Sequence, residues 1–137
     1  VLTYYHRPRF SSGKFGSPRV EEIFRKSFKH GVDLYAAGHE HFAATMPPLD
    51  PLGQIDLSYG VPGLIAGTGG AIFHPKPGER KWKQGGEEVL THTTGVVRIG
   101  LWPGRWSWEF IPVERKADVR YPSGSGSCHD NPPDYVE

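Results

Sequence analysis

The chain has 137 residues, which is enough for one domain with a hydrophobic core. Its 36% apolar and 12% aromatic residues indicate a folded protein rather than a disordered one. The formal net charge of +1 gives no electrostatic basis for binding nucleic acid or a membrane surface. No apolar run reaches the roughly 18 residues that span a bilayer, so the sequence predicts no transmembrane helix.

The first run of the chain, Val1 to Tyr5, is apolar and aromatic and predicts a strand that ends at His6. Pro8 stops this strand because proline cannot continue a central ladder. The run starts without Met or a signal peptide, so we expect a fragment or processed product of a longer protein.

Clear helix signals follow. Ser17 suits the N-cap, Pro18 the first helical position and Gly31 the C-terminal cap, with His30 as a capping residue. An apolar stripe at helical spacing is formed by Val20, Ile23, Phe24 and Phe28. The sequence therefore predicts an amphipathic helix between the first strand and the next one.

A second apolar run, 32–37, predicts a buried strand and leads directly into Gly38-His39-Glu40-His41. Residues i and i+2 of an extended chain share one side, so both imidazoles can enter one cleft. Gly38 is expected to let the backbone turn out of the sheet. The alternative is that one histidine lies at a polar rim and the other is satisfied in the core.

The order strand, helix, strand predicts a βαβ unit with parallel strands, whose carboxyl ends meet at one edge of the sheet. His6 should therefore lie close to His39 and His41. Neutral imidazole is a good ligand for zinc, iron or manganese, so these three residues predict a metal site. One structural zinc ion bound by all three is an open alternative.

The segment beyond the histidines reads as a loop over 46–53, followed by a strand over 63–66. Gly67 to Gly70 predict a tight turn beside the site, with a phosphate cradle as the weaker alternative because no phosphate-loop lysine follows. His74 and His92 are expected to be solvated or locally bonded.

A hairpin is predicted from 95–102 and 105–111 around the type II turn Pro103-Gly104. Its alternating aromatic residues are expected to be core, and a sugar or base site is the alternative; they are Trp106, Trp108 and Phe110. Cys128, the single cysteine, lies in a Ser/Gly-rich stretch and has three open roles: a free thiol, a bridge to another segment, or a buried residue.

Three segments together, 3–13, 38–41 and 67–70, resemble the C-terminal half of a calcineurin-like metallophosphoesterase. The similarity is greatest to the secreted, purple-acid-phosphatase-like bacterial branch, and it extends through the hairpin and the Ser/Gly-rich stretch. It implies an α/β (α+β) fold that forms the C-terminal half of a four-layer αββα sandwich. Residues 1–113 would belong to the catalytic domain and residues 114–137 to an irregular tail. It also implies secretion or a periplasmic location.

The resemblance implies hydrolysis of phosphoesters by a hydroxide that bridges two divalent or trivalent ions of iron, zinc or manganese. His6 and His39 would bind one ion and His41 the other. Arg7 and Lys14 are candidates for phosphate contacts, and the alternative for each is a solvated loop charge.

The family's other ligands, two aspartates, an asparagine and a histidine, come from motifs that this chain lacks. The expected partners are therefore the phosphoester substrate and the missing N-terminal half of the same domain, and the isolated chain is expected to be inactive. Phe15 and the stretch 42–45 stand where the family often carries polar groups near the substrate. A catalytically silent metal- or ligand-binding module of the same fold is thus the alternative function.

Overall fold

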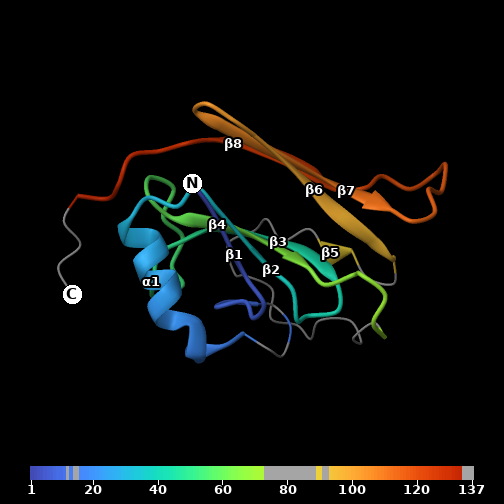
Figure 1. Cartoon of the computed structure of the whole chain (residues 1–137), viewed down its shortest axis with the longest axis horizontal. Coiled ribbons are helices and arrows are strands. Elements are labelled where there is room, and N and C mark those ends of the chain that lie inside the picture. Colours follow the sequence, from blue (N-terminus) through green and yellow to red (C-terminus); the bar gives the residue numbers. More distant parts are fainter. Residues whose placement is uncertain (12, 14–15, 73–88, 91–92, 134–137) are drawn as a thin grey trace.

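The fold is mixed α and β, with two sheets and, among the described residues, one α-helix (Figure 1). The computed structural model describes residues 1–11, 13, 16–72, 89–90 and 93–133. Its elements are β1 (Leu2–Tyr5), the short 3-10 helix η1 (Pro18–Val20), α1 (Glu21–Lys29), β2 (Leu34–Ala37), β3 (Ala43–Leu49), β4 (Val61–Ala66), β5 (Val89–Leu90), β6 (Gly95–Trp102), β7 (Arg105–Pro112) and β8 (Ser123–Ser127). Within that part of the chain, no helix is long and apolar enough to cross a membrane.

The first sheet has five strands in the order β1-β2-β4-β3-β5. β1 pairs with β2 in parallel and β2 pairs with β4 in parallel, whereas β3 runs antiparallel to both β4 and β5. The predicted βαβ unit with two parallel strands is therefore confirmed. In the register of this unit Tyr5 is opposite Ala37, so β1 and β2 end level at one edge of the sheet.

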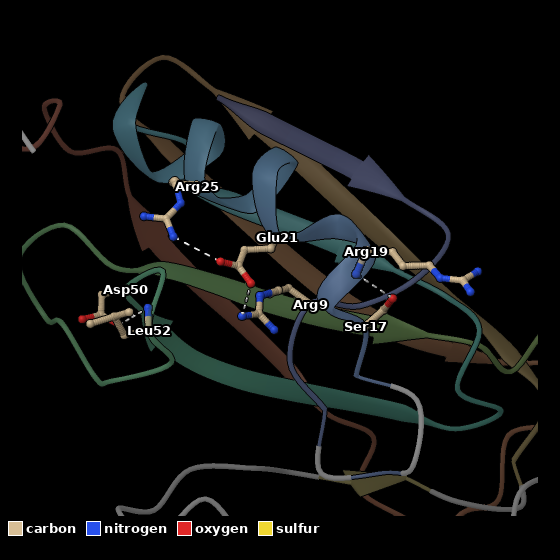
Figure 2. A network of polar contacts seen from close by, with 7 residues as sticks. All are labelled: Arg9, Ser17, Arg19, Glu21, Arg25, Asp50 and Leu52. Atoms are coloured by element: carbon tan, nitrogen blue, oxygen red, sulfur yellow. Dashed lines mark hydrogen bonds and ion pairs between the residues drawn. The ribbon is translucent and has the colours of Figure 1, made fainter. Parts of the chain in front are cut away.

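The helical segment begins at Pro18 and ends before Gly31, as its capping residues predict, but its first turn is the 3-10 helix η1 and α1 starts at Glu21. Ser17 Oγ accepts a hydrogen bond from the Arg19 N–H at 3.3 Å, and Gly31 has a positive φ of 59°. Figure 2 shows how the loop after β1 is joined to the first turn of α1. The carboxylate of Glu21 accepts hydrogen bonds from Arg9 at 2.9 Å and from Arg25 at 3.1 Å, which fixes the path of the chain from the strand into the helix.

The helix α1 and the second sheet lie on opposite faces of the first sheet (Figure 1), and an apolar cluster fills each interface. On one face Phe24 and Phe28 of α1 pack on Tyr35 of β2. The other face is covered by the second sheet, where Leu34 belongs to the same cluster as Trp106 and Trp108. Because side chains alternate along a strand, β2 contributes to both layers, and the order of layers is helix, sheet, sheet.

The second sheet has the order β6-β7-β8, with antiparallel pairing throughout. The predicted hairpin is confirmed, and Gly104 has the positive φ of 73° that a type II turn requires at its second central position. The prediction that the alternating aromatic residues of β7 are core is also confirmed, since Trp106, Trp108 and Phe110 are all buried.

The prediction of an irregular tail over 114–137 is wrong for Ser123–Ser127, which form β8 against β7. Its composition is typical of a loop, but each glycine makes room for an indole. A Cβ on Gly124 would lie 2.6 Å from Trp108 Nε1, and one on Gly126 would overlap the ring of Trp106. The Ser/Gly alternation is therefore a strand pattern set by the two tryptophans.

The prediction of a loop from residue 46 onward is wrong for Met46–Leu49, which belong to β3. Pro47 and Pro48 are unfavourable in a strand, because proline has no N–H to donate to a ladder. The pairing of β3 with β4 shifts register between Met46 and Leu49, so both prolines lie where the regular ladder is interrupted. The strand continues beyond them.

Candidate metal centre

The structure brings His6 and His39 together at the carboxyl ends of β1 and β2. His6 Nε2 and His39 Nδ1 form a hydrogen bond at 3.1 Å, and their rings meet edge to face with centroids 4.9 Å apart. The Gly38 N–H donates to the His6 carbonyl at 3.0 Å, which extends the contact between the two strands by one further hydrogen bond. The parallel pairing thus places two imidazole nitrogens at one point.

The turn that presents the histidines has an unusual backbone. The Glu40 N–H donates to the Gly38 carbonyl at 2.7 Å and the Phe42 N–H donates to the Glu40 carbonyl at 2.8 Å. These are two successive γ-turns, centred on His39 and His41. The positive φ lies at His39, at 65°, and not at Gly38 as expected from the sequence. A left-handed conformation costs a non-glycine residue about 1–2 kcal/mol, so the surrounding contacts must hold it.

Glu40 supplies one of these contacts. Its side chain is only 1% exposed, and its carboxylate accepts a hydrogen bond from Ser11 Oγ at 2.7 Å. Ser11 Oγ in turn accepts the N–H of Gly13 at 2.9 Å, and a Cβ on Gly13 would overlap the Glu40 carboxylate. The loop after β1 is therefore fastened directly to the turn that carries His39 and His41.

The turn beside the site provides the other support. A Cβ on Gly67 would overlap the Glu40 carbonyl oxygen, so only glycine fits there. The next residue, Thr68, is buried and exchanges two hydrogen bonds with Gly95: its Oγ1 donates to the Gly95 carbonyl at 2.9 Å, and the Gly95 N–H donates to its carbonyl at 3.1 Å. These contacts connect the histidine motif to the start of the second sheet. Where the sequence predicts a tight turn, residues 67–68 are irregular and residues 69–71 form a bend.

His41 faces a different partner from the other two histidines. Its Nδ1 lies 2.6 Å from the Ile72 carbonyl oxygen. A carbonyl can only accept, so Nδ1 carries the proton and the lone pair of the neutral ring is on Nε2. Among the described residues, no group of three or more His, Cys, Asp or Glu side chains is placed to hold one ion. In the described part of the chain, His6 and His39 therefore contact each other, whereas His41 contacts the Ile72 carbonyl.

The surroundings of His39 favour its neutral imidazole. Partial burial lowers the pKa of His39 below its ordinary value, the positive charges of Arg7 and His6 lower it further, and Glu40 opposes this. Neutral imidazole is the form that binds a metal ion. Arg7 is exposed beside the pair, whereas the other phosphate-contact candidate, Lys14, lies outside the described residues, as do Phe15, His74 and His92.

Sequence reasoning found the three histidines and missed Glu40. The available signal was alternation, since a residue between two same-side histidines points to the other side of the chain. A buried carboxylate there needs a donor, and Ser11 in the loop after β1 is one. A comparison of the sequence with protein-family models finds no match, and neither does a comparison with curated proteins.

Proposed function

We propose that this chain is the C-terminal part of a two-metal phosphoesterase and supplies His6, His39 and His41 as ligands. The observation that carries the proposal is the 3.1 Å separation of His6 Nε2 and His39 Nδ1. Two nitrogens bound to one zinc ion at about 2.0–2.1 Å are about 2.9–3.4 Å apart for bond angles of about 90–110°. The two nitrogens, which share a hydrogen bond here, are thus also at a separation that fits two ligands of one ion.

The proposal assigns the second ion to His41, whose Nε2 carries the lone pair while Nδ1 donates to Ile72. Bound at these positions, two divalent or trivalent ions, with iron, zinc and manganese as candidates, would supply Lewis acidity toward phosphoryl oxygens and lower the pKa of water to near neutral. Arg7 adds a positive charge beside the pair, which suits an anionic phosphoester substrate. A secreted or periplasmic location belongs to the same proposal.

The partner in this proposal is the N-terminal half of the same domain, which would complete the αββα sandwich and add the acidic ligands. Two exposed apolar side chains support it. Tyr4 is on the face of the first sheet that points to the second sheet, because its register partner Ala36 packs there, yet it is 80% exposed. Leu101 is on the inner face of the second sheet, opposite Trp106, and is 59% exposed. Both would be covered if the two sheets were wider.

A metal titration tests the site. Calorimetry with Zn²⁺ and with Mn²⁺ should give an affinity that falls at least about 10-fold in His6→Ala and in His39→Ala, because each variant removes one ligand. His30→Ala is the matched control, since His30 is an exposed histidine at the end of α1. Equal affinity in all three variants and the original chain would overturn the site.

A turnover assay tests the reaction. A longer chain that adds the acidic ligands should hydrolyse bis(p-nitrophenyl) phosphate in a metal-dependent way, and the 137-residue chain alone should not. Metal binding with no turnover by the longer chain would favour the silent binding module. The silent module is suggested by Phe42, Ala43 and Ala44, which are buried apolar residues where the family carries polar groups. One tightly bound ion whose removal unfolds the chain would favour the structural zinc site.

A further inference from the structure

The second sheet has a hollow of about 600 Å³ on the face that is turned away from the first sheet. The strand register sets its floor in two rows: Arg98, Glu109 and Ser123 lie side by side, and so do Gly100, Ser107 and Ser125. These residues alternate with Trp106 and Trp108, which point inward to the first sheet. The volume lies in the range of about 300–1,000 Å³ that is usual for small-molecule sites.

An exposed indole forms one wall of this hollow. Trp102 is 48% exposed and lies over Gly100, where a Cβ would overlap the far end of its ring. The Arg105 guanidinium is 5.1 Å from the ring centroid, which is within cation–π range. The absence of a side chain at Gly100 thus lets the indole lie across the strands beside the serines, as an apolar surface next to polar groups.

The polar groups in the hollow balance each other in charge. Arg98 and Glu109 form an ion pair across β6 and β7, and the remaining polar side chains are the hydroxyls of Ser107, Ser123 and Ser125. An anion would meet the Glu109 carboxylate, and a wholly apolar ligand would strip water from the ion pair and the hydroxyls without replacing their hydrogen bonds. The lining fits a neutral ligand that has many hydroxyl groups and one apolar face.

We propose that this face of β6, β7 and β8 is a carbohydrate-binding site. A sugar ring would stack its C–H face on Trp102, and its hydroxyls would exchange hydrogen bonds with Ser107, Ser125 and the Arg98–Glu109 pair. The site shares no residue with the histidine site, and its test uses neither metal binding nor turnover. It requires that the second helix layer of a completed αββα sandwich leave this face of β6, β7 and β8 open. Because the hollow is shallow and open, affinity is expected to be weak and to increase with the number of sugar units in contact.

The test is saturation-transfer difference NMR of the 137-residue chain with cellotetraose, maltotetraose and chitotetraose at up to about 10 mM. At least one tetrasaccharide should bind, and Trp102→Ala should lower its affinity at least about 10-fold. Tyr4→Ala is the matched control, since Tyr4 is an exposed aromatic residue of the other sheet. Ser125→Leu fills the hollow while leaving the indole in place, and it should cause the same loss.

Circular dichroism and thermal melting establish whether each variant is folded. If Trp102→Ala does not fold, sugar binding by Ser125→Leu decides whether the hollow is the binding site. Adenosine monophosphate is the comparison ligand, because it has a flat ring to stack and a charged phosphate. Three results would overturn the proposal: no tetrasaccharide binds the folded chain, the nucleotide binds and the sugars do not, or sugar binding is unchanged in both variants.

Discussion

Adding one methyl group at Gly67 should disrupt the histidine motif, whereas adding it two residues later should not. In Gly67→Ala the new Cβ would overlap the Glu40 carbonyl oxygen, which lies between His39 and His41 in the chain. At Gly69 a Cβ has no other heavy atom within 4 Å. Neither glycine has a left-handed φ, so the two substitutions differ in their contacts and not in backbone preference.

The cost at Gly67 follows from what would have to move. The Glu40 carbonyl would need to shift by more than an ångström, but it already accepts the Phe42 N–H at 2.8 Å, and the Gly67 N–H is held by the Phe42 carbonyl at 3.1 Å. Overpacking costs about 1–3 kcal/mol, and a buried hydrogen bond left unmade costs a similar amount. Gly67→Ala should therefore lower the free energy of unfolding by about 2–6 kcal/mol, and Gly69→Ala should change it by less than about 0.5 kcal/mol.

Urea unfolding of both variants measures this difference, and a Zn²⁺ titration under native conditions measures its effect on the site. Zinc affinity should fall in Gly67→Ala, because the γ-turns at His39 and His41 both use Glu40 backbone atoms. It should be unchanged in Gly69→Ala. Equal stability of the two variants would show that the close packing of Gly67 on Glu40 does not exist in solution.

Three further predictions concern the helix, the last strand and the ionisation of the site. Phe24→Ala should cost about 3–5 kcal/mol of unfolding free energy because Phe24 is fully buried, whereas Ile23→Ala, in a side chain that is 47% exposed, should cost less than about 1 kcal/mol. Gly126→Ala should cost about 1–3 kcal/mol in the same urea assay, since its Cβ would overlap the indole above it. In the metal-free chain, an NMR titration should show His39 losing its proton at a lower pH than an ordinary histidine, and Arg7→Gln should raise that pH. The pKa of His39 is lower in the folded chain than in the unfolded chain. The contribution of His39 to the free energy of unfolding should therefore be complete above about pH 6.5 and should be lost as the pH falls toward the folded pKa.

The sequence predicts the first half of the fold well because its signals there are local. The helix caps, the apolar stripe and the strand before Gly38 each depend on residues close in the chain. The meeting of His6 with His39 follows from one further rule, that the strands of a βαβ unit are parallel. That rule was enough to place two imidazoles together from residues 33 positions apart.

The errors arose where distant contacts outweigh local composition. Pro47 and Pro48 indicate a loop, yet β3 contains both because its register with β4 shifts at that point. Ser123–Ser127 have loop composition, but the tryptophans of β7 need small residues opposite them. Glu40 was missed for the same reason, since its importance depends on Ser11 and Gly13 in another loop. None of these contacts can be recognised from a short stretch of the sequence, because each joins segments that are far apart in the chain.

The contacts that position His39 are made by the protein itself, as we expect if the proposed metal site is functional rather than structural. The φ of 65° is held by the Glu40–Ser11 hydrogen bond, the γ-turn bonds and the packing of Gly67, none of which includes an imidazole nitrogen. A structural zinc ion contributes most of the free energy of folding, so its ligands have no other reason to lie together. Here the turn has its own supports. Chelation should therefore remove metal from the chain while leaving its melting temperature nearly unchanged, and a collapse of the fold on chelation would instead assign the histidines to a structural site.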